Sequence, residues 1–376
     1  MRIMYIISSM IYSHGTEQTL SDKINYLSAK GHDVSLVTYE QSGKQYAFEL
    51  NNQVNCYDCN CCFYKLYNYS RLIRPLKYRR LYHIFQTEIR AIYNKCNPDV
   101  IVTTTYDVEA IHALSCLKLP ISLICESHVS YVSYMKGGSI LQKYRNALLL
   151  RRLRKFNLLI ALSNADLMSW SKKLNHVIKI NNPISYYPDS ICESKKIIGR
   201  ILAVGRLCPQ KRFDRLINAF ALIKDNNPDW FIDIFGDGED EDMLNKQIKE
   251  MGLEGRVNLK GVTSNIFSEY ECCEMFVLSS DYEGFPLVLL EAMACGTPVI
   301  STDCPHGASE LIDNGITGLL CRMEVEDLAE KMEWMMNHKE ERKRIGSRAR
   351  QSVAKYKKDV VMKMWEKAYE EACENA

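Results

Sequence analysis

The chain is 376 residues long, and at roughly one domain per 150 residues it is expected to hold two or three domains. Hydrophobic residues make up 47% and charged residues 25% of it, which excludes a largely disordered chain. The formal net charge of +2 excludes a strongly basic nucleic-acid wrapper, and no nucleic-acid partner is expected.

Short apolar strands alternate with helical patterns along the whole chain. In the first half, strands are predicted at residues 2–8, 34–38, 100–104, 121–125, 158–162 and 177–180. In the second half, they are predicted at residues 197–204, 231–235, 257–259, 275–278, 299–301 and 318–321. Because these strands are apolar throughout and helices separate them, they indicate two parallel six-stranded sheets in two tandem Rossmann-like, doubly wound α/β domains. A ligand is expected at the carboxyl ends of the strands, in a cleft between the domains.

The first and last helices can be placed from local sequence signals. Thr16 is predicted to cap the first helix, and Gly31 to end it. The final segment has a helical pattern that offers four side chains for packing, namely Val360, Met364, Trp365 and Tyr369.

Fifteen cysteines raise the question of the compartment. The apolar run that opens the chain is too short for a signal peptide, and no segment has the roughly 18 apolar residues that a bilayer span needs. A cytoplasmic protein with reduced thiols is therefore expected. The cluster of Cys56, Cys59, Cys61 and Cys62 lacks a second ligand pair, which favours free thiols over a zinc site.

A basic loop follows the first strand of the second half. Gly205 permits a tight turn, and Arg206 and Lys211 follow it before a helix that begins near Phe213. Two cations beside a helix N-terminus suit a diphosphate. Taken alone, the pattern fits a solvated loop equally well.

Two glutamates flank the start of a later helix. Glu283 precedes this helix, Pro286 is predicted at its first position, and Glu291 lies inside it among apolar residues. A buried carboxylate needs polar hydrogens, which either ligand hydroxyls or an internal Arg or Lys would supply. The backbone N–H groups of Gly284 and Phe285 are expected to point outward, where they suit an anionic or hydroxyl-rich ligand.

This stretch resembles the paired-glutamate signature of retaining glycosyltransferases of the GT-B fold, family 4. Gly236-Asp237-Gly238 and the segment 303–320 support the resemblance, which is specific over residues 197–321 and weaker over the first half. It implies two such domains, residues 1–182 on the acceptor side and residues 183–355 on the nucleotide-sugar side. It also implies that a helix over residues 356–376 crosses back to the first domain.

The resemblance also implies roles for the donor-binding residues. Arg206 and Lys211 would hold the diphosphate of a nucleotide-sugar donor, Glu291 the ribose hydroxyls, and Glu283 the transferred sugar. The backbone at Gly261 and Val262 would meet the nucleobase, and the N–H groups of Gly284 and Phe285 the sugar hydroxyls.

Two positions in the first half extend the resemblance. Gly15 matches a glycine-rich loop that faces the diphosphate and the acceptor, although the family usually has paired glycines where this chain has His14-Gly15. His128, in Glu126-Ser127-His128, matches a histidine that lies against the donor sugar.

The mechanism expected from the donor is electrostatic. Negative charge builds on the leaving diphosphate, and Arg206 and Lys211 are placed to stabilise it. With Glu283 and His128 they form the predicted catalytic set, and neither a metal ion nor another cofactor is expected. The acidic run at residues 237–242 is interpreted as a complement to a helix dipole rather than as a metal site.

Two basic segments in the first half predict an anionic membrane surface as a partner. Residues 65–95 carry eight Lys or Arg against one acid, and residues 129–164 carry seven and no acid. Their interleaved apolar anchors are Tyr67, Tyr69, Tyr78 and Tyr82 in the first segment, and Leu148, Leu149, Leu150 and Leu153 in the second. Such segments bind anionic membranes, so a lipid-linked saccharide acceptor at the inner face of the membrane is expected. A solvated basic face is the alternative.

The sequence as a whole therefore predicts a retaining hexosyltransferase that uses a UDP-sugar in cell-surface polysaccharide or glycolipid synthesis. Two alternatives stay open, a nucleotide-sugar epimerase of GT-B build and a catalytically inactive partner subunit that binds nucleotide sugar. A nicotinamide-dependent oxidoreductase is disfavoured because no G-x-G-x-x-G follows the first strand.

Overall fold

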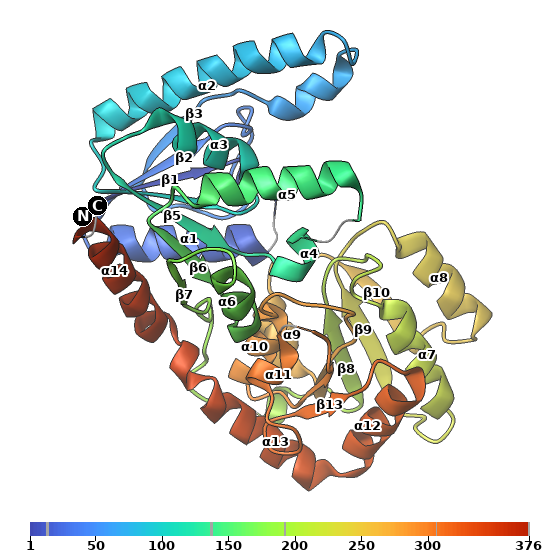
Figure 1. Cartoon of the computed structure of the whole chain (residues 1–376). Helices are drawn as coiled ribbons and strands as arrows, with labels where there is room; N and C mark the ends of the chain where they lie inside the picture. The colour runs from blue at the N-terminus through green and yellow to red at the C-terminus, as the bar shows by residue number, and fades with distance from the viewer. Residues whose placement is uncertain (13–14, 136–137, 192, 306, 375–376) are drawn as a thin grey trace. The chain divides into compact units, whose positions relative to one another are not determined.

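The computed structural model describes residues 1–12, 15–135, 138–191, 193–305 and 307–374 (Figure 1). The chain forms two compact units. The first unit comprises Met1–Asn181 together with Val361–Ala376, and the second comprises Asn182–Val360. Each unit contains one parallel β-sheet joined by helices, which confirms the predicted pair of doubly wound α/β domains.

The first unit is built on a seven-stranded sheet with the order β3-β2-β1-β4-β5-β6-β7. Its strands are β1 (Arg2–Ile7), β2 (Asp33–Thr38), β3 (Asn55–Asp58), β4 (Val100–Thr104), β5 (Ser122–Ser127), β6 (Leu158–Ala161) and β7 (Val177–Lys179). All neighbouring strands pair in parallel. The prediction of six strands was wrong here because it omitted β3, a short edge strand whose side chains are mostly exposed and therefore lack an apolar pattern.

The second unit contains the six strands that were predicted, in the order β10-β9-β8-β11-β12-β13. They are β8 (Arg200–Val204), β9 (Phe231–Phe235), β10 (Val257–Gly261), β11 (Met275–Leu278), β12 (Val299–Thr302) and β13 (Leu319–Cys321). All pairings are again parallel. The order reverses direction at β8 and β11, so the loops after these two central strands lie at the switch point where doubly wound sheets bind ligands.

Helices connect the strands in both units. The first unit contains η1 (Phe63–Asn68), α1 (Gly15–Ala29), α2 (Arg74–Cys96), α3 (Val108–Leu117), α4 (Tyr131–Met135), α5 (Ile140–Leu153), α6 (Asn164–Ser171) and most of α14 (Lys358–Glu374). The second contains η2 (Glu193–Lys195), α7 (Phe213–Ile223), α8 (Glu241–Glu250), α9 (Ile266–Cys272), α10 (Leu287–Ala294), α11 (Ala308–Leu311), α12 (Val325–Asn337), α13 (Lys339–Ser352) and η3 (Ala354–Tyr356). Among the helices described, none combines the length and the apolar composition that a bilayer span requires.

The sequence pattern explains how these elements pack. Successive residues of β1 and β8 are buried, as expected for strands covered on both faces. Helix α7 instead buries one apolar stripe that includes Phe213, Leu216 and Phe220, the spacing of an amphipathic helix.

The two ends of α1 test two local predictions. Gly31 has φ +87° and lies two residues after the last residue of α1, in the turn that ends the helix as predicted. Thr16 is not the cap, because the helix already includes Gly15.

Most of the terminal helix α14 belongs to the first unit (Figure 1). Its Trp365 and Tyr369 are buried, as the sequence predicted. Val360 and Met364, however, are about half exposed. The helical period instead brings Val361 and Met362 onto the buried face with the two aromatic residues.

Candidate active site

In the second unit, the loops after β8 and β11 are joined by hydrogen bonds. Gln210 donates from Nε2 to the carbonyl of Tyr282 (2.8 Å), and its own carbonyl accepts from the N–H of Asp281 (2.9 Å). The hydroxyl of Ser279 donates to the carbonyl of Lys211 (2.8 Å). These contacts fix the predicted basic loop against the segment that carries Glu283.

Lys211 and Glu283, predicted from separate motifs, meet directly. The ammonium of Lys211 lies 2.7 Å from Oε1 of Glu283, which also accepts a hydrogen bond from Ser280 (2.6 Å). Both side chains are largely buried, so the pair is only partly screened by solvent. The loop therefore presents a fixed, paired cation at the switch point rather than a freely solvated one.

Arg206 complements this pair because it is an exposed residue. Within the described part of the chain it has no hydrogen-bonding or ionic partner, so it is available to an anionic ligand. The loop backbone is set by Gly236, where a Cβ would lie 1.9 Å from the carbonyl oxygen of Gly205. Only glycine permits this approach.

The end of β10 is tied to the same loops. The carbonyl of Gly261 accepts a hydrogen bond from the N–H of Gly236 (2.9 Å), and the N–H of Gly205 donates to the carbonyl of Phe235 (3.0 Å). Val262 follows with 61% of its surface exposed. Gly261 and Val262 thus lie at the carboxyl edge of the sheet, where the resemblance requires a nucleobase contact.

The start of α10 leaves backbone donors unused. In the described residues, the N–H groups of Gly284 and Phe285 have no acceptor, so they can bind a ligand oxygen. Phe285 itself packs against Tyr356. Pro286 occupies the N-cap position, one residue earlier than predicted, because its ψ of 89° lies outside the helical region.

Glu291 is buried in α10, as its apolar neighbours indicated. The hydroxyl of Tyr270, on α9, donates to its Oε2 (3.1 Å). The sequence had suggested ligand hydroxyls or an internal Arg or Lys as the donors, and it gave no signal for this tyrosine. Burial, with Glu291 as the nearest carboxylate, raises the pKa of Tyr270 well above its ordinary value, so the hydroxyl remains a donor.

The two positions predicted in the first unit lie at the start of α1 and directly after β5. Gly15 is exposed at the first position of α1, and His14 lies outside the described residues. His128 follows β5 with its side chain only 1% exposed, and its Nε2 lies 2.9 Å from Oε2 of Glu126. The interaction with Glu126, the first residue of the quoted segment, was not predicted.

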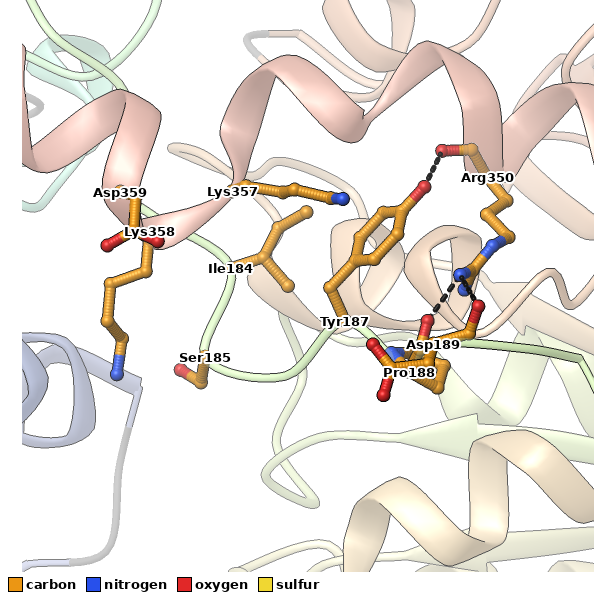
Figure 2. Close-up of a pocket in the computed structure, with 9 residues that line it drawn as sticks. All are labelled: Ile184, Ser185, Tyr187, Pro188, Asp189, Arg350, Lys357, Lys358 and Asp359. Carbon is orange, nitrogen blue, oxygen red and sulfur yellow. Dashed lines mark hydrogen bonds between the residues drawn. The ribbon is translucent and has the colours of Figure 1, made fainter.

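The part of the chain that the structure describes contains no cluster of three or more His, Cys, Asp or Glu side chains arranged to hold a metal ion. A cavity of about 320 Å³ lies in the second unit between the segment Ile184–Asp189 and Arg350–Asp359 (Figure 2). None of the predicted site residues lines it.

The cavity of Figure 2 is instead a structural junction. Arg350 donates to the carbonyls of Pro188 and Ala294, and its guanidinium stacks on the ring of Tyr187. Tyr187 donates in return to the carbonyl of Arg350 (3.1 Å), and the ammonium of Lys357 lies 4.1 Å from the centroid of the same ring. These contacts clamp the segment that follows Asn181 onto the end of α13.

Comparison with known families divides the chain in the same way. A family model described as Glycosyl transferases group 1 matches residues 194–352. A second, described as Glycosyltransferase Family 4, matches residues 13–180. The matched segments include every predicted site residue.

Curated relatives and solved structures agree with these matches. The amylovoran biosynthesis glycosyltransferase AmsD of Erwinia amylovora is 25% identical over 375 residues, which is 97% of this chain and 98% of the relative. The N-acetylgalactosamine-N,N'-diacetylbacillosaminyl-diphospho-undecaprenol 4-alpha-N-acetylgalactosaminyltransferase of Campylobacter jejuni is 39% identical over 127 residues, 34% of each chain. The structure of HepE from Anabaena in complex with UDP has a TM-score of 0.74 at 18% identity and covers 99% of this chain and 100% of its own, a likeness of fold.

Proposed function

Because the chain belongs to the family 4 glycosyltransferases of the GT-B fold, we propose that it is a retaining hexosyltransferase. It would move a sugar from a UDP-sugar to a saccharide acceptor, lipid-linked at the inner face of the membrane, in the synthesis of a cell-surface polysaccharide or glycolipid. The observation that carries the proposal is the pairing of Lys211 with Glu283 beside the exposed Arg206.

In this proposal the chain's own residues stabilise the leaving group. As the bond to the anomeric carbon breaks, negative charge grows on the β-phosphate. Arg206, Lys211 and the free N–H groups at the start of α10 would stabilise that charge, so that no metal ion is needed. Glu283, held in place by Lys211 and Ser280, would contact the transferred sugar. Retention of anomeric configuration is proposed from the family signature.

The relatives support the donor and acceptor that we propose. HepE binds UDP in its solved complex, which favours a uridine nucleotide. The Campylobacter enzyme is named for a diphospho-undecaprenol-linked saccharide, which favours a lipid-linked acceptor. The Erwinia relative acts in amylovoran biosynthesis, in keeping with a surface polysaccharide.

Incubation of the full chain with a panel of radiolabelled nucleotide sugars, with and without lipid-linked acceptors, tests the activity. Acceptor-dependent transfer from a UDP-sugar is the expected result. Interconversion of sugars without transfer would indicate the epimerase alternative, and binding without turnover would indicate the inactive partner subunit.

A prediction on binding concerns Glu291. Glu291→Gln should raise the Kd for UDP about tenfold while leaving kcat at saturating donor nearly unchanged. The reason is that a carboxylate that accepts ribose hydroxyls acts equally in the ground and transition states. Titration calorimetry with UDP measures this. Glu271→Gln, which alters a partly exposed acid paired with Lys195, is the matched control and should bind UDP as the unaltered protein does.

In the first basic segment, the structure shows which apolar side chains are exposed at the proposed membrane surface. Leu72 and Leu76 are 89% and 70% exposed beside the basic residues of α2, and Tyr67 and Tyr69 are exposed as expected. Tyr78 and Tyr82 are instead half-buried and stack on each other, so they are not surface anchors.

In the second basic segment, none of the four predicted leucine anchors is fully exposed, and Leu148 and Leu150 are half-buried. Leu149 and Leu153 are buried in the core. The exposed apolar residues at the start of α5 are Ile140, Leu141 and Tyr144. The helical period places Leu149 and Leu153 on the same face of α5, and this face packs into the core. The cationic side chains lie on the opposite, solvated face.

Flotation with liposomes tests this surface. The chain should float with anionic vesicles at low salt and be released at high salt, because each cation near an anionic surface adds about 1 kcal/mol. The double variant Leu72→Asp, Leu76→Asp should lose flotation. Leu222→Asp, which alters a residue of the second unit with 59% exposure, is the control. Absence of flotation of the unaltered chain at low salt would contradict the proposal.

A further inference from the structure

A buried polar network surrounds Glu126 at the carboxyl end of β5. Oε1 of Glu126 accepts hydrogen bonds from the ammonium of Lys23 (2.6 Å) and from the hydroxyl of Tyr369 (2.8 Å). Its Oε2 faces Nε2 of His128. Lys23 lies on α1 and Tyr369 on α14. The carboxylate is therefore held by the first helix and the last helix of the first unit.

The charge state of Glu126 decides which nitrogen of His128 carries a proton. Burial alone would raise the pKa of Glu126, but Lys23 and His128 lower it below its ordinary value. An ionised carboxylate only accepts hydrogen bonds, so Nε2 of His128 must be the donor. In the neutral ring Nδ1 is then left as an acceptor.

That acceptor is unsatisfied. Nδ1 of His128 is buried and has no hydrogen-bonding partner within the described residues, a condition that costs free energy unless a donor meets it. It lies just beyond the carboxyl end of β5, an interior strand of the sheet, and ligands of doubly wound sheets bind outside the carboxyl ends of the strands. A ligand hydroxyl is the chemical group that satisfies a neutral nitrogen acceptor.

We propose that Glu126 is a positioning residue that fixes His128 as its Nε2–H tautomer, so that Nδ1 accepts a hydrogen bond from a hydroxyl of the sugar substrate. Tyr369 of the terminal helix holds Glu126 in the required orientation. The identity of the ligand rests on the proposed function, whereas the tautomer is a property of the protein alone.

Long-range ¹H–¹⁵N NMR of the full chain, labelled at histidine, tests the tautomer. The chain has eight histidines, and His128→Gln identifies the resonance of interest. We expect the Nε2–H tautomer in the unaltered protein and a mixture in Glu126→Gln. Tyr5→Phe is the matched control, since the hydroxyl of Tyr5 contacts Tyr369 (2.8 Å) but not Glu126. An Nδ1–H tautomer or a mixture in the unaltered protein would overturn the proposal.

A double-mutant cycle tests whether Glu126 acts through His128. Glu126→Gln should lower kcat about tenfold or more, and should cause no further loss in a His128→Ala background. Tyr369→Phe should give a smaller loss with the same non-additivity, and it serves as the test if Glu126→Gln fails to fold. Additive losses would show that Glu126 has a merely structural role. If no nucleotide sugar is turned over, the proposed function fails while the NMR result still decides the positioning role.

Discussion

Replacing Lys211 with alanine is expected to lower kcat by about 10²-fold or more. The ammonium lies in a largely buried loop at the switch point of the second sheet, paired with Glu283. A fixed cation in such a place stabilises charge that develops in the transition state more than charge in the ground state. Initial rates with the donor identified in the transfer assay measure the effect.

Glu283→Gln should cause a comparable loss. The amide keeps the size of the side chain and can still accept from Ser280, but it removes the negative charge that pairs with Lys211. Because the two residues form one unit, the double variant should lose far less than the product of the single losses. Lys246→Ala, which removes a lysine that is 76% exposed and paired only with Glu250 among the described residues, is the control.

Unaltered rates in either single variant would contradict the assignment of the site. A structural explanation must also be separated from a catalytic one, because removal of Lys211 leaves the carboxylate of Glu283 without its cation. Rates should therefore be measured well below the Tm of each variant. A loss of kcat that disappears on cooling would indicate instability rather than catalysis.

The fold followed from the sequence wherever local pattern decides structure. Buried parallel strands are apolar along their whole length, so those of the second sheet could all be placed. The strand Asn55–Asp58 could not, because it is short, exposed and paired on one side only. Its place in the sheet depends on pairing with β2, which no local property encodes.

The candidate site likewise contains residues that the sequence predicted and one that it did not. Arg206, Lys211, Glu283 and Glu291 were found because each belongs to a compact motif at a strand or helix end. Tyr270 is 21 residues from its partner Glu291, and its sequence neighbours give it the character of an ordinary core aromatic. Its contribution depends on the packing of α9 against α10, which only the structure supplies.

The network around Glu126 could not be predicted either, because its members are far apart in the sequence. One residue of it, Lys23, nevertheless left a sign in the sequence. Glu126 is 103 residues from Lys23 and 243 from Tyr369, so no motif joins them. Lys23, however, falls beside Leu20, Ile24 and Leu27 on the buried face of α1. A lysine within an apolar stripe needs a buried partner, so this position alone predicts a buried acid elsewhere in the first unit.

Lys23→Met is expected to lower the free energy of unfolding of the first unit by about 3–5 kcal/mol at pH 7. Both Lys23 and Glu126 are fully buried, so the change leaves a carboxylate without its cation in a site of low dielectric constant. The Lys23 ammonium also lies 3.1 Å above the ring centroid of Trp365, and this cation–π contact is lost with it. Denaturant unfolding followed by tryptophan fluorescence reports the change directly. Lys30→Met, which alters an exposed residue directly after the same helix, should stay within about 0.5 kcal/mol of the unaltered chain.

The pH dependence of this deficit identifies its electrostatic origin. In the unaltered chain, burial opposes ionisation of Glu126 but Lys23 and His128 lower its pKa from 4.5 to about 2, so its stabilising contribution is complete above pH 4.5 and is lost as the pH falls toward 2. Without Lys23, only His128 offsets burial and the pKa of Glu126 rises, so the variant loses less stability than the unaltered chain as the pH falls. Burial lowers the pKa of Lys23 to about 8, and the comparison therefore belongs below that pH. The loss of unfolding free energy in Lys23→Met should be largest near pH 7 and should shrink at about pH 3.5. A loss that is constant over this range would mean that the introduced methionine side chain disturbs packing and that the ion pair contributes nothing.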